Sequence, residues 1–135
     1  MYQSLFKDMI FNMEEIYKNY SQISNCSKDY PNQDQLHHYY ELEMRKFNHT
    51  NDIEILEVGF GNGSFINWCK IKNYKISGYE LDKNFYENAK SKFDNIYIGN
   101  ENEVSKIIGK KFDLIVGFDV IEHVKKKDRI FSLNF

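Results

Sequence analysis

The sequence feature that most constrains the fold is an apolar run that passes directly into a glycine-rich loop and then into a helical pattern. The run is Ile53–Val58, the loop carries Gly59, Gly61 and Gly63, and the helical pattern begins at Ser64. Glycine at these three positions permits a tight turn, lets a ligand approach the backbone closely, and opens a helix whose first amide groups can face that ligand. The segment therefore predicts a ligand-binding turn at the carboxyl end of a strand.

Strand-like and helical patterns alternate from residue 53 onward. Short apolar runs predict four strands, and the segments between them carry apolar residues at helical spacing. We expect strands over residues 53–58, 75–80, 95–98 and 112–118, and helices over residues 64–71, from the cap Asp82, and from the cap Asn100. Strands that alternate with helices form βαβ units, whose right-handed crossovers build a parallel sheet. The sequence therefore predicts an α/β fold.

The preceding part of the chain shows a purely helical pattern. Residues 1–20 carry apolar side chains at alternating steps of four and three, which is typical of an amphipathic helix. This helix either dimerises as a coiled coil or packs on its own domain, and we favour packing because fewer than three heptads are too few to indicate a coiled coil. A second helix follows from about residue 32, with Leu36, Tyr40, Met44 and Phe47 on one face. We divide the chain into an N-terminal helical segment, residues 1–52, and an α/β domain, residues 53–135.

Composition and charge exclude several classes of function. The 135 residues carry a net charge of −2, so no basic excess favours binding to nucleic acid or to anionic membranes. No apolar run approaches the roughly 18 residues of a membrane span. Two cysteines cannot form a disulfide framework, and a reducing cytoplasm is the expected compartment.

An acidic residue at the end of the second predicted strand indicates the kind of ligand. Glu80 closes that strand, and a carboxylate there can accept hydrogen bonds from the two hydroxyls of a ribose. The alternative is a purely structural loop with Glu80 exposed at the surface. The glycine spacing is G-x-G-x-G, and Glu57 lies two residues before the first glycine. Because a carboxylate there would repel a pyrophosphate, the pattern disfavours a nicotinamide dinucleotide and suits a ligand with an ammonium group.

Three segments together resemble a known family. Residues 57–63 (EVGFGNG) resemble motif I of the class I S-adenosylmethionine (SAM)-dependent methyltransferases, residues 78–82 (GYELD) the acidic motif that follows it, and residues 112–124 (FDLIVGFDVIEHV) the fourth-strand motif. The resemblance implies a Rossmann-like, partly parallel sheet with helices on both faces, in which the strands present have the order 3-2-1-4. It also implies SAM as the cofactor and S-adenosylhomocysteine (SAH) as the product.

The resemblance implies roles for individual residues. Glu57 would anchor the methionine ammonium, the three glycines would line the methionine and ribose, and Glu80 would hold the ribose hydroxyls. For Asn100, a contact with the adenine and a helix-capping role are equally compatible with the sequence, and Asp119 would lie beside the methionine end of the cofactor. The implied cofactor contacts are Glu57, Gly59, Phe60, Gly61, Gly63, Glu80, Leu81, Asn100 and Asp119.

The acceptor side is less sharply defined. The resemblance places Glu122 and His123 just after the fourth strand, where His123 could accept the acceptor's proton, or where both could only orient the turn. We expect His37, His38 and His49 to be exposed and not to bind a metal. The expected substrate is a small-molecule methyl acceptor, such as a sugar or surface-polysaccharide precursor, rather than nucleic acid. The alternative is a non-catalytic methyltransferase-fold fragment that serves as a binding module.

The family's sheet has seven strands, in the order 3-2-1-4-5-7-6, and this sequence predicts four of them. The chain is therefore expected to be truncated after the fourth strand, which would leave residues 114–118 as an apolar edge that invites association. Otherwise the N-terminal helices, a second copy of the chain in a homodimer, or a separate partner chain would cover this edge. A truncated chain could keep its affinity for SAM and lose catalysis.

Overall fold

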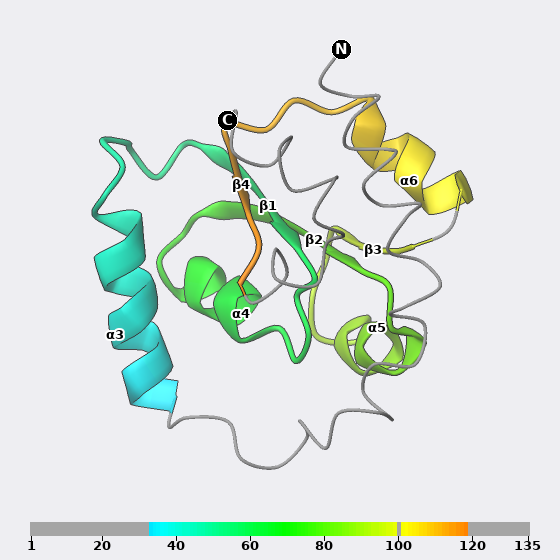
Figure 1. Ribbon diagram of the computed structural model, residues 1–135, viewed down its shortest axis with the longest axis horizontal. Helices are drawn as coiled ribbons and strands as arrows, with labels where there is room; N and C mark the ends of the chain where they lie inside the picture. The colour runs from blue at the N-terminus through cyan, green and yellow to red at the C-terminus, as the bar shows by residue number, and fades with distance from the viewer. Residues whose placement is uncertain (1–32, 100, 119–135) are drawn as a thin grey trace, which may run out of the picture.

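The computed structural model describes residues 33–99 and 101–118 (Figure 1). The predicted helix over residues 1–20 and everything beyond residue 118 lie outside the described residues. The four strands and the three helices between them are all present, so the predicted α/β pattern is confirmed. In chain order, the elements are α3 (Gln33–Met44), β1 (Glu54–Val58), α4 (Ser64–Ile71), β2 (Lys75–Glu80), α5 (Lys83–Ala89), β3 (Ile96–Ile98), α6 (Glu101–Ile108) and β4 (Leu114–Val116).

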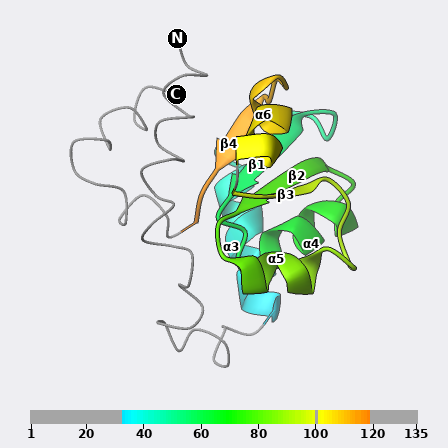
Figure 2. The same ribbon diagram turned by 90° about the vertical axis from the view of Figure 1, so that its right-hand side faces the viewer.

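The four strands form one parallel sheet in the order β3-β2-β1-β4, which confirms the predicted order. The connections β1–α4–β2 and β2–α5–β3 step across the sheet in one direction, whereas β3–α6–β4 steps back past β2 and β1. Because such crossovers are right-handed, α4 and α5 must cover one face and α6 the other. Figure 2 shows this arrangement, with α3 on the same side as α4 and α5. The predicted helices on both faces are thereby confirmed.

The reversal of strand order defines where a ligand can bind. β1 lies between β2 and β4, and the helix that follows β1 and the helix that precedes β4 cover opposite faces. In open α/β sheets, a crevice forms outside the carboxyl ends of the strands at such a switch point. The glycine-rich loop follows β1 at this edge, and Phe118 follows the end of β4 there. The sheet thus places the glycine-rich loop beside the described start of the fourth-strand motif, residues 112–118.

Two strands are shorter than predicted. β4 spans Leu114–Val116 rather than residues 112–118, and β3 spans Ile96–Ile98 rather than residues 95–98. At the start of β4, the N–H of Glu54 donates to the Asp113 carboxylate at 2.8 Å, and the N–H of Asp113 donates to the Glu54 carbonyl at 2.8 Å. The Asp113 carboxylate accepts the hydrogen bond that a main-chain carbonyl would accept in a regular parallel pair. Regular pairing of β4 with β1 therefore begins at the next residue, Leu114.

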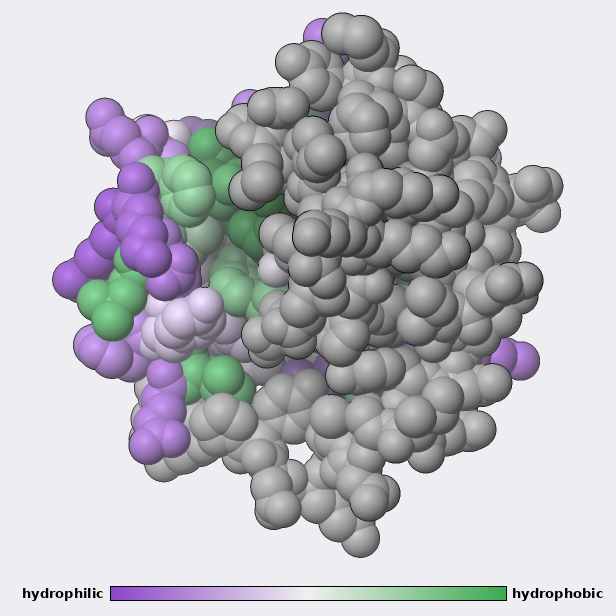
Figure 3. All heavy atoms as spheres, in the orientation of Figure 1, coloured by the Kyte–Doolittle hydropathy of each residue, from purple (hydrophilic) through white to green (hydrophobic). Residues whose placement is uncertain are grey.

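α3 packs beside α4 and shares a core with the α/β part of the chain. Tyr40 and Met44 of α3 are buried in one apolar cluster with Ile55 of β1 and with Phe65, Trp68 and Cys69 of α4. The prediction that Phe47 extends this buried face is wrong, because α3 ends at Met44 and the Phe47 side chain is 49% exposed. The outer surface over α3 is mainly hydrophilic (Figure 3).

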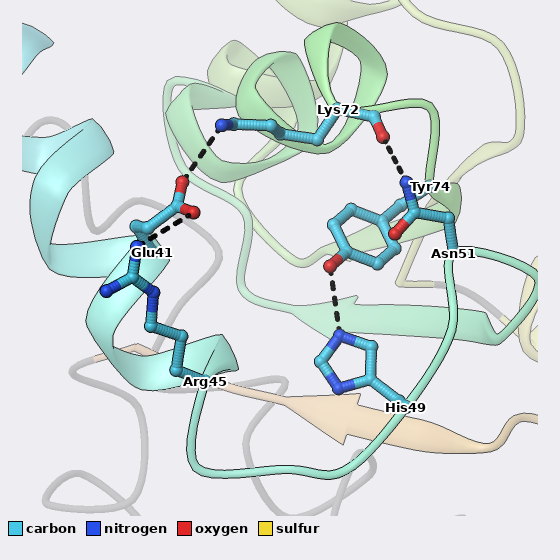
Figure 4. Close-up of polar contacts among 6 residues, drawn as sticks. All are labelled: Glu41, Arg45, His49, Asn51, Lys72 and Tyr74. Carbon is cyan, nitrogen blue, oxygen red and sulfur yellow. Dashed lines mark hydrogen bonds and ion pairs between the residues drawn. The ribbon is translucent and has the colours of Figure 1, made fainter.

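Polar contacts tie α3 and the loop before β1 to the end of α4 (Figure 4). The Glu41 carboxylate lies 2.9 Å from Lys72 Nζ and 3.6 Å from the Arg45 guanidinium. The hydrogen bond from Lys72 lowers the pKa of Glu41. The side-chain amide of Asn51 donates to the carbonyl oxygen of Lys72 at 2.9 Å. Because the charged groups are well exposed, the ion pairs orient these segments more than they stabilise them.

His49 holds the same loop with both ring nitrogens. Nδ1 lies 2.7 Å from the Phe47 carbonyl oxygen, and Nε2 lies 2.9 Å from the Tyr74 hydroxyl (Figure 4). Because a carbonyl oxygen only accepts hydrogen bonds, Nδ1 carries a proton and donates it. The prediction that His49 is an exposed loop residue is therefore wrong: it is half-buried and links the loop to β2 through the residue just before that strand.

Candidate functional site

The loop after β1 requires glycine at three positions. Gly59, Gly61 and Gly63 have φ angles of 74°, 54° and 79°, in the left-handed region that residues with a side chain rarely adopt. The N–H of Gly59 donates to the Tyr79 carbonyl at 2.7 Å, which continues the β1–β2 pairing. The N–H of Gly63 donates to the Phe60 carbonyl at 2.8 Å, which closes the turn. The tight turn expected from the sequence is present, and it opens directly into α4.

Glu80 joins this loop to the end of β2. Its Oε2 accepts a hydrogen bond from the N–H of Gly61 at 2.8 Å. Its Oε1 accepts hydrogen bonds from the N–H groups of Leu81 and Asp82, at 2.8 Å and 3.0 Å. Glu80 is 7% exposed, so the alternative of a surface glutamate is wrong. Burial raises the pKa of Glu80, and the three backbone donors partly offset this rise.

The backbone donors leave Glu80 little capacity for further contacts. An ionised carboxylate has about four acceptor positions, shared equally by its oxygens. Among the described residues, 33–99 and 101–118, Oε1 of Glu80 accepts two hydrogen bonds and Oε2 accepts one, so a single position on Oε2 remains for a ligand. The geometry fits one direct hydrogen bond from a ligand hydroxyl to this carboxylate.

Glu57 is a second buried carboxyl group at the same edge of the sheet. It precedes the last residue of β1, is 3% exposed, and pairs in register with Gly78 of β2 and Val116 of β4. Within the part of the chain that the structure describes, its Oε2 has no hydrogen-bond partner. Burial raises the pKa of Glu57 well above its ordinary value, and the negative charge of Glu80 raises it further. A carboxyl group in this position needs either a proton or a cationic partner.

Two further polar side chains have shielded atoms that the sequence pattern did not identify. Ser64 Oγ, on the first residue of α4, and His37 Nε2, on α3, have no hydrogen-bond partner among residues 33–99 and 101–118. The prediction that His37 is exposed is wrong, since the residue is half-buried, whereas His38 is exposed as expected. The spacing of His37 from Tyr40 and Met44 was the available signal, because it places His37 on the buried face of the helix.

Two of the expected cofactor contacts turn their side chains into the protein interior. Phe60 packs with Ile66 and Ala89 beneath α4 and α5. The Leu81 side chain lies against Gly99, the residue that follows β3. Both side chains are buried, so contact with a ligand would have to come from backbone atoms of these residues.

Replacing Gly78 by alanine should destabilise this edge of the sheet. A β-carbon at Gly78 would lie 2.5 Å from Ile66 Cδ1 and 2.8 Å from Phe60 Cδ1. Because both neighbours are buried, the clash forces a shift in the core, and we expect the free energy of unfolding to fall by about 1–3 kcal/mol. Urea denaturation measures the change. Gly109→Ala is the matched control, because a β-carbon there meets no atom within 4 Å; a Gly78→Ala protein as stable as this control would contradict the packing.

Four of the predicted site residues lie outside the described residues, and their roles stay predictions: Asn100, Asp119, Glu122 and His123. Within the described ranges, no group of three or more His, Cys, Asp or Glu side chains could hold a metal ion. No helix in these ranges is long and apolar enough to cross a membrane. Cys69 is buried, and burial raises the pKa of its thiol, so it acts as a packing residue rather than a nucleophile.

Comparison with known protein families finds a match over most of the chain. A family model described as a methyltransferase domain matches residues 32–133, a range that includes every element from α3 to β4. No curated protein and no solved structure matches the chain. The matched range begins just before α3, so it joins this helix to the α/β part in a single unit of sequence.

Proposed function

This chain belongs to the methyltransferase domain family, and we propose that it transfers a methyl group from SAM to a small-molecule acceptor. The observation that carries the choice of cofactor is the buried Oε2 of Glu57, which has no partner in the described part of the chain. Glu57 and Glu80 bring two carboxyl groups to the glycine-rich loop, so the site disfavours phosphate groups and favours a cation. SAM carries an ammonium group and no phosphate.

The described residues fit SAM with distinct roles. Glu57 Oε2, ionised, would accept a hydrogen bond from the methionine ammonium. The remaining acceptor position on Glu80 Oε2 would accept a hydrogen bond from one ribose hydroxyl. The backbone of the loop from Gly59 to Gly63, including Phe60, and the backbone of Leu81 would line the cofactor, since glycine lets a ligand approach closely. Asn100 and Asp119 would complete the site, at the adenine and at the methionine end.

When bound, SAM supplies a methyl group that its sulfonium makes electrophilic. The residues of this chain then have two tasks. They hold the cofactor and the acceptor so that the reacting atoms are in line, and they take up the proton that the acceptor loses. We assign the second task to His123, with Glu122 beside it, on the strength of the family resemblance.

The remaining expectations about substrate, location and partners also stay predictions. A small acceptor, such as a sugar, is favoured over nucleic acid by the net charge of −2. A cytoplasmic location rests on the low number of cysteines. β4 pairs with β1 along one side. The other side would be an open edge in a truncated chain, or it would be covered by the N-terminal helices, a second copy of the chain or a partner chain.

Calorimetric titration of the purified chain with SAH tests the cofactor. We expect saturable binding of one SAH per chain, which SAM competes away, because both ligands carry the ammonium and the ribose. NAD⁺ is the matched control, since it has the same adenosine but carries a pyrophosphate, and we expect no binding. A folded, monodisperse chain that fails to bind SAH, or that binds NAD⁺ instead, would contradict the proposal and would favour the non-catalytic fragment.

A further inference from the structure

Three shielded polar atoms without a partner come from three different elements. They are Nε2 of His37 on α3, Oε2 of Glu57 on β1 and Oγ of Ser64 on α4, and the statement covers residues 33–99 and 101–118. Glu57 and Ser64 are 3% and 7% exposed. Shielded polar atoms in proteins are nearly always hydrogen-bonded, so each of these three atoms needs a partner from outside the described residues.

The register of β1 places Glu57 beneath the first turns of α4. Side chains two residues apart on a strand share a face, so Glu57 lies on the same face as Ile55. Ile55 packs in the cluster with Phe65 and Cys69 of α4. Burial raises the pKa of the Cys69 thiol, and the negative charge of Glu57 raises it further, in keeping with this placement of Glu57. Ser64 begins α4 at the end where β1 finishes.

The direction of α3 brings His37 to the same place. α3 and α4 run in the same direction, away from the carboxyl ends of the strands (Figure 1). Tyr40 contacts Phe65 near the start of α4, whereas Glu41 and Met44, which come later in α3, lie near the end of α4. The ring of Tyr40 lies 5.0 Å from that of Phe65 and 5.2 Å from that of Phe118, which follows β4. His37 precedes Tyr40 by about one turn on the same helix face. It therefore lies beyond Tyr40, toward the start of α4 and the carboxyl ends of β1 and β4.

The three atoms have complementary chemistry. Glu57 Oε2 is an acceptor with a negative charge when ionised, whereas a serine hydroxyl and a histidine Nε2–H are donors. The first amide groups of α4, beside Ser64, add positive electrostatic potential on the donor side. An acceptor and two donors at the same end of the sheet complement a free α-amino acid, in which an ammonium and a carboxylate share one carbon.

We infer that His37 and Ser64 hold the carboxylate at the amino-acid end of the cofactor, while Glu57 holds its ammonium. The inference rests on the proposed function, because SAM and SAH both end in a free amino acid. It makes α3 part of the binding site rather than an accessory to the α/β domain. Recognition of the whole amino-acid end separates SAM and SAH from adenosine ligands that lack it.

Binding of SAH and of 5′-methylthioadenosine to point variants tests this assignment. 5′-Methylthioadenosine keeps the nucleoside and the sulfur but has no amino-acid end. Replacing His37 by phenylalanine, or Ser64 by alanine, removes one donor to a carboxylate, and we expect a loss of about 10- to 100-fold in SAH affinity. The affinity for 5′-methylthioadenosine should not change. His37→Gln, whose amide can donate from a similar position, should restore most of the SAH affinity.

His38→Phe is the matched control, because His38 is the exposed neighbour on the same helix and should leave both affinities unchanged. Thermal unfolding of each variant separates binding from folding, and Ser64→Ala carries the test if His37→Phe does not fold. Equal losses for SAH and 5′-methylthioadenosine, or unchanged SAH affinity in both variants, would overturn the inference and leave the proposed function standing. A wild-type chain that binds neither ligand would overturn both.

Discussion

Replacement of Glu80 by alanine is expected to abolish detectable SAH binding and to lower the stability of the free protein. The substitution removes the acceptor of three backbone N–H groups, those of Gly61, Leu81 and Asp82. A buried donor left without a partner costs about 1–3 kcal/mol. Part of the total cost for the three donors is offset, because the folded protein no longer has to keep a carboxylate away from water. We expect the free energy of unfolding, measured by urea denaturation, to fall by about 2–4 kcal/mol, and calorimetric titration with SAH to show no saturation.

Two further variants separate the causes of this loss. Glu87→Ala removes an exposed glutamate of α5 and should change neither stability nor binding appreciably. Glu80→Gln keeps one acceptor oxygen, and if that oxygen serves Leu81 and Asp82, the amide nitrogen faces the N–H of Gly61. This variant should keep more stability than Glu80→Ala and still bind SAH weakly, because the loop loses its attachment. Wild-type SAH affinity in Glu80→Ala would rule out a ribose contact at this carboxylate.

Replacement of Glu57 by glutamine is expected to stabilise the free protein at pH 8 while weakening SAH binding. Burial raises the pKa of Glu57 well above its ordinary value, so the folded chain keeps a proton that the unfolded chain releases above about pH 4.3. The wild type therefore loses stability as the pH rises from there through the raised pKa, by about 1.4 kcal/mol for each unit of the difference. Glutamine does not titrate and removes this contribution.

Urea denaturation at pH 5 and pH 8 measures the first effect, and SAH titration at pH 8 measures the second. The neutral amide offers no charge to the ammonium, so we expect SAH affinity to fall by about 10- to 100-fold. Glu54→Gln, at the exposed start of the same strand, is the matched control and should leave SAH affinity unchanged. The prediction fails if Glu57→Gln keeps the wild-type loss of stability between the two pH values, or if it binds SAH as tightly as the wild type.

Much of the fold could be predicted because its signals are local. The three glycines sit where the backbone adopts positive φ, and the spacing of apolar residues follows the period of each element. The strand order β3-β2-β1-β4 was instead predicted from the family resemblance. In the folded sheet, the described parts of the motifs lie together at the carboxyl ends of the strands. Element ends were less predictable: β4 begins late because Asp113 accepts a hydrogen bond from Glu54, a residue of another strand.

The sequence by itself determined the strand, glycine loop and helix of the site, and the acid that ends the second strand, because residue type and spacing specify them locally. Only the tertiary structure decided how those groups behave. Glu80 reaches the N–H of Gly61 across 19 residues, and His49 reaches Tyr74 across 25. Burial of Glu57 between two strands, and the approach of His37 on a helix from outside the motifs, likewise depend on packing between distant segments. Burial and charge are properties of the assembled core. They leave the Glu57 carboxyl group in a position where it needs a proton or a cationic partner.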